Sequence, residues 1–317
     1  MQEFQRSLAQ GILEDLDTHT LADAQVWDAT SGMMSIRYGG HPKGANDIRW
    51  TPTGDRLLTA GASDGTAQVW SAMSGRQVAR YADESLSQQS MIMLARAVEE
   101  SSAAKRSMLQ KGAGDVQWVQ AALWSSDGQR ILATYANEVY VWAADSGQRL
   151  LTYGAHRGRV QALTVAPDGR QAASANGWLV HIWDALSRGS TKLIYRGHAH
   201  AQRSVFALAW SPDGTRIASS AGGETHVWDA SSGATLTTYR GHTRYGMWNA
   251  LAWSPDSRRL ATGGREGEVH IWDAQTGERH DIYREHQTLI TAVAWSPDGK
   301  RIASGDRDGD IHIWPIG

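Results

Sequence analysis

Short apolar runs alternate with tight turns along most of the chain, and the last repeat shows this arrangement most clearly. Residues 292–295 are apolar, and the SPDG sequence at 296–299 predicts a turn, because proline presets φ and glycine accepts a positive φ. Residues 301–304 predict a second strand, which ends at the DRDG turn of 306–309. Apolar and polar residues alternate over 311–314, which is typical of a half-buried strand. This segment therefore predicts three short strands connected by two turns.

Copies of this pattern recur, so internal repetition is the main signal in the sequence. Each copy has a strand that ends in tryptophan, and successive copies are 41 to 45 residues apart, except for one gap of 72 residues. A turn and another strand follow, ending in Tyr-x-Gly-His or a variant of it, as at 239–242. The tryptophans that end these strands are Trp27, Trp70, Trp142, Trp183, Trp228, Trp272 and Trp314.

The sequences AWSPDG, RIAS, DG-x-(V/I)-x-IWD and Gly-His carry a resemblance to a known family. Their order and period resemble those of the WD-repeat β-propeller family, here of a bacterial type, over roughly residues 23–317 apart from one insertion. The resemblance implies an all-β propeller of four-stranded blades. One such sheet cannot bury both of its faces, so neighbouring sheets must stack around a ring. The periodic tryptophans are expected to fill the spaces between blades.

The number of blades follows from counting strands. The sequence offers six first strands, six second strands, seven third strands and six fourth strands. Six blades are favoured, with the strand at 34–38 closing the ring by completing the blade that ends at Trp314. Seven blades are the alternative, but they would need a first and a second strand from residues 1–22. Those residues instead place Phe4, Leu8 and Ile12 at the spacing of a helix.

The 72-residue gap predicts an insertion. Residues 84–114 are expected to form a helical insertion between the first and second blades, because Met91, Leu94 and Val98 share one helical face. The predicted organisation is an N-terminal helical extension at 1–22 and a single propeller domain at 23–317. The insertion should enter on the face that carries the Gly-His segments, here called the top face.

Composition narrows the classes of function. The formal net charge of −2 argues against nucleic acid or a polybasic membrane surface as partner. The absence of cysteine excludes disulfides and thiolate metal sites. The first residues carry no apolar run long enough for a signal peptide or a membrane span. We therefore expect a cytoplasmic protein that acts as a monomeric platform without a metal or other cofactor.

Most of the 12 histidines follow the repeat, which indicates a structural role for them. The resemblance implies a His–Ser/Thr–Asp–Trp hydrogen-bond network within blades, and it is structural in the family although it looks like a catalytic triad. The first blade has Ala60 where Ser is expected. The networks expected in the last and fifth blades are His286, Ser304, Asp308 and Trp314, and His242, Thr262, Glu266 and Trp272.

Residues that depart from the repeat are candidates for partner binding, because the scaffold does not require them. Tryptophan, tyrosine, arginine and methionine are enriched in protein interfaces. Several such residues fall at the start of first strands or in turns expected on the top face, with Trp178 nearby. The predicted contacts are Trp118, Arg159, Arg244, Tyr245, Met247, Arg265, Leu289 and Arg307.

These observations favour a non-catalytic scaffold that binds a protein or peptide on its top face. The alternative is a propeller that binds a small molecule or a glycan, which would need a deep pocket with convergent polar groups. A propeller enzyme is less favoured, because it would need convergent histidines or carboxylates. The sequence shows neither arrangement.

Overall fold

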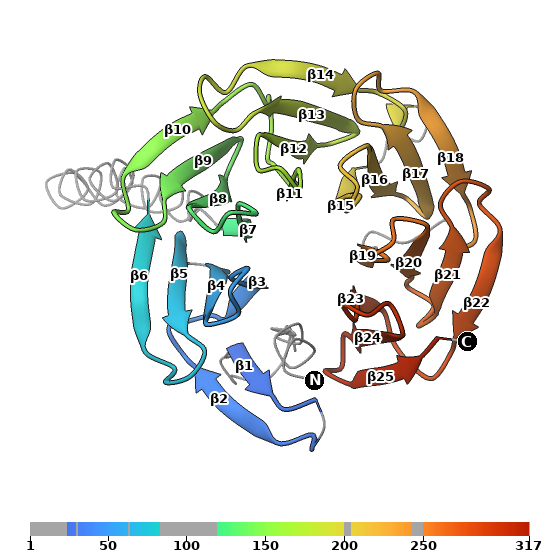
Figure 1. Cartoon of the computed structure of the whole chain (residues 1–317), viewed down its shortest axis with the longest axis horizontal. Helices are drawn as coiled ribbons and strands as arrows, with labels where there is room; N and C mark the ends of the chain where they lie inside the picture. Colours follow the sequence, from blue (N-terminus) through green and yellow to red (C-terminus); the bar gives the residue numbers. More distant parts are fainter. Residues whose placement is uncertain are drawn as a thin grey trace, which may run out of the picture.

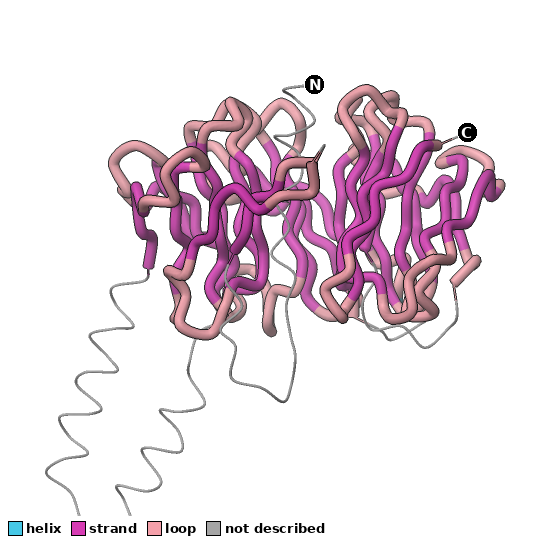
Figure 2. Tube along the Cα trace, turned by 90° about the horizontal axis from the view of Figure 1, so that it is seen from below, coloured by secondary structure: helices cyan, strands magenta, loops and turns pink. Residues whose placement is uncertain are grey.

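The computed structural model describes residues 24–29, 31–62, 64–82, 119–199, 204–242 and 250–316, and every regular element in them is a β-strand. Figure 1 shows the strands arranged as radial sheets around a ring. Figure 2 shows the strands crossing the thickness of that ring, with loops gathered on its two opposite faces. The all-β propeller predicted from the repeats is confirmed. The expected helices at 1–22 and 84–114 lie outside the described residues.

Five antiparallel sheets have four strands each, and we number them blades one to five in chain order. Within each blade the strands pair in sequence order, with the first strand nearest the ring centre (Figure 1). The blades contain β3 (Ala45–Trp50), β4 (Arg56–Gly61), β5 (Thr66–Ser71) and β6 (Gln77–Ala82); β7 (Val119–Trp124), β8 (Arg130–Tyr135), β9 (Glu138–Ala143) and β10 (Arg149–Tyr153); β11 (Ala162–Val165), β12 (Gln171–Asn176), β13 (Leu179–Asp184) and β14 (Thr191–Tyr195); β15 (Val205–Trp210), β16 (Arg216–Ala221), β17 (Glu224–Asp229) and β18 (Thr235–Tyr239); and β19 (Ala250–Trp253), β20 (Arg259–Gly263), β21 (Val269–Asp273) and β22 (Arg279–Tyr283).

Blade six has three strands among the described residues, and a separate two-stranded sheet precedes blade one. Blade six contains β23 (Ile290–Trp295), β24 (Arg301–Asp306) and β25 (Ile311–Pro315), and the two-stranded sheet contains β1 (Ala24–Trp27) and β2 (Met34–Tyr38). The described strands therefore give six blades, as favoured from the sequence, and lend no support to seven.

The predicted closure of the ring is wrong. The strand at 34–38 pairs with β1, with Ala24 opposite Tyr38, and does not complete blade six. The turn between them explains this choice: Asp28 N donates to Met33 O at 2.9 Å, and Ser31 N donates to the Asp28 carboxylate at 2.8 Å. Pairing across a short turn closes a far smaller loop than pairing with the distant β25, so it costs less conformational entropy.

The SPDG turns form because their residues make specific hydrogen bonds and adopt specific backbone conformations. In blade four, Ser211 Oγ donates to the Asp213 carboxylate at 2.6 Å and accepts from Arg216 N at 2.9 Å. Gly214 has a φ of 75°, which side-chain-bearing residues rarely adopt. These turns connect first to second strands on the face opposite the top face, here called the bottom face.

The core lies between neighbouring sheets. In blades two to five, the tyrosine near the end of the fourth strand stacks on the tryptophan near the end of the next blade's third strand, as Tyr153 does on Trp183 with ring centroids 4.5 Å apart. Tyr81 of blade one packs against Trp142 at a tilted angle. Val269 and Ile271 of blade five pack with Ile290 of blade six in the same way. Each blade that has a blade on both sides thus buries both of its faces against its neighbours, which a single sheet cannot do.

Candidate protein-interaction face

The top face is held together by main-chain hydrogen bonds between neighbouring blades. Val160 N donates to Ala136 O at 2.7 Å, Val205 N to Gly177 O at 2.8 Å, and Ile290 N to Gly264 O at 3.0 Å. Each bond links the turn between the second and third strands of one blade to the segment that leads into the first strand of the next. Of the positions predicted for partner binding, Arg159, Arg265 and Leu289 lie in these turns and segments, and Arg307 lies in the turn between β24 and β25.

Blades five and six bring three predicted contact residues together. Leu289 precedes Ile290, whose N–H is bonded to Gly264 O, and Arg265 follows Gly264 in the chain. Arg307 N donates to Leu289 O at 2.9 Å. Arg265 and Arg307 are exposed, and Leu289 is half-buried between their turns. The result is a continuous group with one apolar and two cationic side chains.

Arg159 belongs to a second group, on blades two and three. Its guanidinium donates to Gln120 Oε1 at 3.1 Å, and its carbonyl accepts from Asn176 Nδ2 at 2.9 Å. Trp178, in the adjoining β12–β13 turn, is 43% exposed. Gln120 was not predicted, because a glutamine on an inner strand has no distinctive sequence signal. Trp118, Arg244, Tyr245 and Met247 lie outside the described residues.

Asp47 is a polar residue of the inner wall that the sequence analysis missed. It stands on β3 where the first strands of most other blades have alanine. Its carboxylate accepts from Ala122 N of blade two at 3.4 Å and pairs with Arg49 at 3.2 Å. Burial raises the pKa of this carboxyl group, whereas Arg49 acts in the opposite direction. The contact with Ala122 joins β3 to β7, so Asp47 connects blade one to blade two.

The buried network of blade five contains the four residues expected from the sequence. Trp272 Nε1 donates to Thr262 Oγ1 at 3.2 Å, and the same hydroxyl contacts His242 Nε2 at 2.8 Å. His242 Nδ1 contacts the Glu266 carboxylate. The contacts form one chain that runs from the indole through the hydroxyl and the imidazole to the acid.

Blade six has the same chain with a different acid. His286 Nε2 contacts Ser304 Oγ at 2.7 Å, and Trp314 Nε1 donates to that hydroxyl at 3.3 Å. His286 Nδ1 pairs with Asp306 at 3.1 Å, and not with the predicted Asp308. Asp306 can reach the histidine because it is buried at the end of β24, whereas Asp308 lies in the exposed turn beyond.

The first blade also departs from the expected network, here by one position in the hydroxyl residue. His41 Nε2 contacts Thr59 Oγ1 at 2.8 Å, so Thr59 supplies the hydroxyl that the sequence analysis looked for at Ala60. His41 Nδ1 contacts Asp64 at 2.8 Å. The error arose because Thr59 stands opposite Gln68, nine positions later, whereas Ser304 stands opposite His312, eight positions later. Counting back from the tryptophan by the spacing of the last blade therefore misplaced the hydroxyl by one residue.

Blades three and four lack the acid. His156 Nε2 contacts Ser174 and His198 Nε2 contacts Ser219, each at 2.7 Å, but Nδ1 of both histidines is buried without a hydrogen-bond partner within the described structure. Burial, together with a neighbouring histidine, lowers the pKa of His156 and of His198 to about 3. Both rings are therefore neutral at pH 7.

The two periodic histidine sets stack in pairs inside blades three to six. His198 lies on His226 with ring centroids 4.0 Å apart, and His242 lies on His270 at the same distance. The second ring of each pair contacts the tyrosine of the preceding blade, as His270 Nδ1 does with Tyr239 Oη at 2.8 Å. The histidines thus form local structural pairs in separate blades.

His242, Glu266 and His270 could in principle hold a metal ion, since their ligand atoms lie within 4.8 Å of one another. Both nitrogens of each ring already contact other side chains, however, and His270 Nε2 contacts Glu268 at 2.8 Å. The histidine pair itself repeats in blades that have no such acid. We therefore assign the group to the scaffold.

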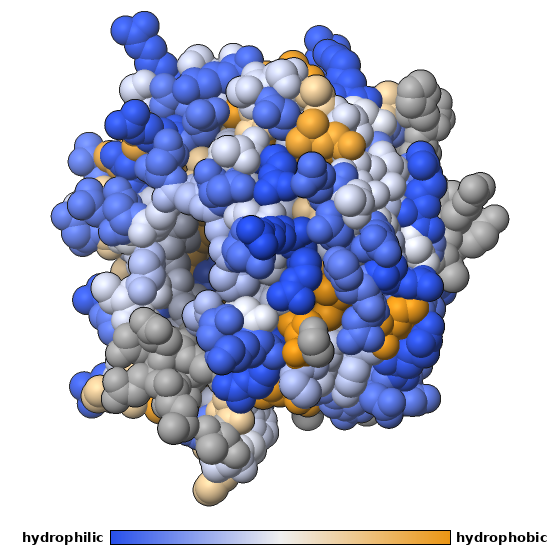
Figure 3. All heavy atoms as spheres, turned by 45° about the vertical axis from the view of Figure 1, so that its right-hand side comes forward, coloured by the Kyte–Doolittle hydropathy of each residue, from blue (hydrophilic) through white to orange (hydrophobic). Residues whose placement is uncertain are grey.

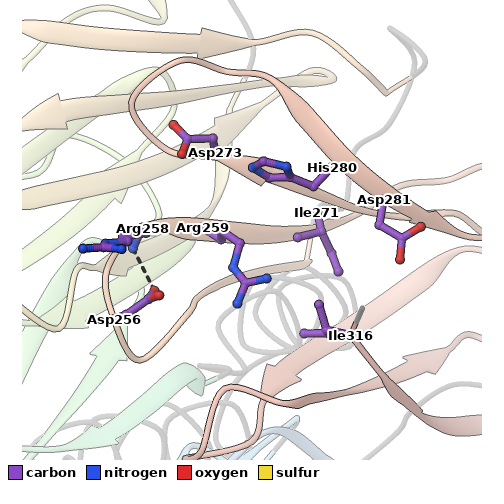
Figure 4. Close-up of a pocket in the computed structure, with 8 residues that line it drawn as sticks. All are labelled: Asp256, Arg258, Arg259, Ile271, Asp273, His280, Asp281 and Ile316. Atoms are coloured by element: carbon purple, nitrogen blue, oxygen red, sulfur yellow. Dashed lines mark hydrogen bonds between the residues drawn. The ribbon is translucent and has the colours of Figure 1, made fainter.

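A cavity of about 530 Å³ lies at the bottom face between blades five and six. Figure 4 shows the side chains around it, with Asp256 accepting a hydrogen bond from Arg258 N at 3.0 Å. Charged and polar side chains dominate the lining, with only two apolar ones. The lining residues are Asp256, Arg258, Arg259, Ile271, Asp273, His280, Asp281 and Ile316.

Comparison with known proteins adds two family matches. The model described as WD domain, G-beta repeat matches residues 33–71, 147–184 and 189–229. The model described as IFT140 first beta-propeller matches residues 217–317. These matches support a WD-repeat propeller family. They give no support to the bacterial type expected from the sequence.

One relative of this chain is transcription initiation factor TFIID subunit 5 of Caenorhabditis elegans. The two are 27% identical over an alignment of 196 residues, and the match covers 54% of this chain and 28% of the relative. WD-repeat propellers are typically protein-interaction scaffolds, and this relative is itself a subunit of a larger factor. In the described part of the chain, no helix has the length and apolar character needed to cross a membrane.

Proposed function

We propose that this chain is a non-catalytic scaffold that binds a protein or peptide on its top face. The observation that carries the proposal is the group of Arg265, Leu289 and Arg307. Main-chain hydrogen bonds across two blades fix its backbone, while two arginines remain exposed. Arginine beside a partly buried apolar residue is a frequent anchor in protein interfaces.

The side chains of this group fit a polar contact rather than a large apolar one, because two of the three are exposed and cationic. Figure 3 brings the outer side of the later blades forward and shows hydrophilic atoms over most of that side, with separate small hydrophobic patches. Arginine side chains recognise carboxylates with two parallel hydrogen bonds. We therefore propose an acidic segment of a protein as the partner of the Arg265–Leu289–Arg307 group.

A catalytic role is less well supported by the buried network. Ser304 is fully buried, and its hydroxyl accepts from Trp314 while it contacts His286. A nucleophile must reach its substrate. The described Ser–His–acid group resembles a triad in composition but has no access to a substrate.

The cavity of Figure 4 is the site for the alternative function, binding of a small molecule. Its volume is in the range of ligand sites, but such sites are lined mainly by apolar and aromatic side chains. This lining is mainly charged, so the scaffold function is favoured. A cytoplasmic, monomeric protein without nucleic acid or membrane as partner belongs to the same proposal, supported by the net charge of −2.

The test compares substitutions on the two faces. Arg265→Ala and Arg307→Ala should each weaken binding of the native partner by about 1–4 kcal/mol, because truncated anchors leave the partner's charged groups unpaired. Lys300→Ala, an exposed cation on the bottom face, is the matched control and should change affinity by less than about 0.5 kcal/mol. The partner is obtained by affinity capture from the native host, and its affinity for each variant is measured by calorimetry.

Equal affinities for wild type, Arg265→Ala and Arg307→Ala would reject this face as the binding site. Loss of binding in Lys300→Ala alone would move the site to the bottom face. Each variant should keep its melting midpoint within a few degrees of wild type, since exposed side chains away from caps and networks contribute little to stability.

A further inference from the structure

Blades three, four and five each carry an arginine directly after the tyrosine that ends the fourth strand. In blade four, Arg240 Nε donates to the Glu224 carboxylate at 2.9 Å. In blade five, Arg284 Nε donates to the Glu268 carboxylate at 2.8 Å. Arg196 of blade three is exposed, and its guanidinium has no acceptor in the described structure. Blade three therefore holds this arginine without its carboxylate.

The position of the missing acid follows from the pairing of strands. In blades four and five the glutamate stands four residues before the tryptophan that ends the third strand, and the same position of blade three is Leu179. The next residue, Val180, stands opposite Tyr195, which precedes Arg196. The pairing therefore places Leu179 beside Arg196, and a leucine side chain accepts no hydrogen bond.

A buried histidine of blade three lacks the same acceptor. In blade five, His270 Nδ1 contacts a tyrosine hydroxyl at 2.8 Å, and His270 Nε2 contacts Glu268 at 2.8 Å. In blade three, His181 Nδ1 makes the same contact with Tyr153 Oη at 2.8 Å, so its Nε2 is directed to the place of the missing glutamate. His181 is only 5% exposed, and its Nε2 has no hydrogen-bond partner within the described ranges.

One carboxylate serves both groups where it is present. Glu268 contacts His270 and Arg284 together, and Glu224 of blade four lies 3.5 Å from His226 Nε2 while it accepts from its arginine. In blade three the two groups lie near each other, because burial and then the charge of Arg196 lower the pKa of His181. Arg196 and His181 thus present two nitrogens to a single acid that this blade does not supply.

The sequence around the site offers no substitute acid. From residue 146 to residue 212 the only acids are Asp168 and Asp184, and both lie at the bottom ends of their strands. The top side of the same stretch includes two further exposed arginines, Arg157 and Arg159. The top of blade three is therefore cationic, which favours an acidic ligand.

We propose that the top of blade three binds an aspartate or glutamate side chain of a partner protein, whose carboxylate takes the place that Glu268 fills in blade five. We call Leu179, His181 and Arg196 the blade-three carboxylate site. Arginine is well suited to this task, because its guanidinium matches the geometry of a carboxylate. Trp178 is 43% exposed and adjoins Leu179, so it offers an aromatic contact to residues that flank the bound acid.

The choice of a protein as the source of the carboxylate rests on the proposed function. The site adds to that function a second anchor for an acidic segment, on a different part of the top face from the Arg265–Leu289–Arg307 group.

The test uses two acetylated and amidated peptides, one of four glutamates and one of four glutamines, added to the full chain at fixed ionic strength. NMR signals of the Arg196 Nε–H group and of the His181 ring should shift saturably with the glutamate peptide, with a Kd below about 1 mM. The glutamine peptide should leave both signals unchanged, because it carries no carboxylate side chain.

Two substitutions and one control locate the site. Leu179→Glu gives blade three the acid that blades four and five have, and it should weaken peptide binding at least about tenfold by repelling a second carboxylate. Arg196→Gln removes the cation and should weaken binding, followed at the His181 ring, by a similar factor. Arg188→Gln changes an exposed arginine at the bottom of the same blade and should leave binding within about twofold.

The converse substitution in blade four tests the cause. Glu224→Leu removes the acceptor of Arg240 and should create a second site, seen as a new shift of the Arg240 Nε–H signal with the glutamate peptide. Because Leu179→Glu, Arg196→Gln and Glu224→Leu change different strands, misfolding of one variant leaves the others as tests.

Several outcomes would overturn the proposal. These are a Kd above about 1 mM at the Arg196 and His181 signals, equal shifts with the glutamine peptide, and unchanged binding in Leu179→Glu and Arg196→Gln. Native-partner affinity that is equal in wild type and Arg196→Gln would reject a protein as the source of the carboxylate. Failure of the proposed top-face function differs from these, because it appears as unchanged partner affinity in Arg265→Ala and Arg307→Ala.

Discussion

Blades four and six contain the same tryptophan, serine and histidine in the same contacts, yet only blade six has an acid. In blade four, His198 contacts Ser219 and leaves Nδ1 without a hydrogen bond in the described structure. In blade six, His286 contacts Ser304 and also pairs with Asp306. Both histidines are almost completely buried. The indole–hydroxyl–imidazole part of the network therefore forms with or without the carboxylate.

Turn length explains the difference. In blade four only residues 222–223 separate the second and third strands, and both are glycine. In blade six residues 307–310 separate them, and the N–H groups of Asp308 and Asp310 donate to the Asp306 carboxylate at 3.1 and 3.0 Å. The Asp306 carboxylate thus orders the longer turn as well as the histidine. A two-residue turn does not require such an acceptor.

The largest expected effect is one that the two kinds of blade share. Trp228→Ala in blade four and Trp314→Ala in blade six should each lower the free energy of unfolding by about 3–5 kcal/mol, since each leaves a large cavity under a stacked tyrosine. Denaturant titration followed by circular dichroism measures both. A loss below about 1 kcal/mol in either variant would mean that the tryptophan is not part of the core.

The next effect should separate the two aspartates of blade six. Asp306→Ala should cost about 1–3 kcal/mol, because His286 and two turn N–H groups lose their acceptor. Asp308→Ala should cost less than about 0.5 kcal/mol, because that side chain is exposed. Equal losses in the two variants would contradict the network as the structure shows it.

Acidification should lower the free energy of unfolding, because the blades that lack the carboxylate contain buried neutral histidines. The pKa of His198 is lowered to about 3 by burial, compared with about 6.5 in an unfolded chain. Between these values the unfolded state binds more protons than the folded state, so the free energy of unfolding falls as pH is lowered from about 6.5 toward 3. The limiting slope for one such histidine is about 1.4 kcal/mol per pH unit.

His198→Gln removes this proton uptake and should flatten the pH dependence of unfolding by up to that amount between pH 6 and 4, roughly the window in which the unfolded histidine is protonated. The measurement is a series of urea titrations at fixed ionic strength. A variant whose pH slope equals that of wild type would show that His198 does not control acid sensitivity.

The smallest expected effect should be equal in a blade that lacks the acid and in a blade that has it. Arg240 pairs with Glu224 at 2.9 Å in blade four, and Arg284 pairs with Glu268 at 2.8 Å in blade five. Both arginines are exposed, so Arg240→Ala and Arg284→Ala should each cost about 0.2–1 kcal/mol and less at high salt. A loss above about 2 kcal/mol would mean that the pair supports the turn beneath it.

The repeat made the fold predictable, but it could not settle choices between equivalent copies. The spacing of tryptophans specified the blades, because each copy must bury the same indole. The sequence around residues 306–308 offered two aspartates, and only burial distinguishes Asp306 from Asp308. The strand at 34–38 had two tryptophan-ended partners with similar patterns, β1 and β25, and a short turn decided in favour of β1. Gln120 and Asp47 make their contacts with neighbouring blades, so the sequence of a single repeat did not predict them.

The main-chain bonds of the top face have a consequence for how recognition could be altered. Arg159, Arg265 and Leu289 each adjoin a residue whose peptide group bonds the neighbouring blade. A peptide bond is the same whatever side chain stands beside it. These three positions can therefore exchange one side chain for another while the ring keeps its geometry, and a library randomised at them alone should yield folded proteins with new partners.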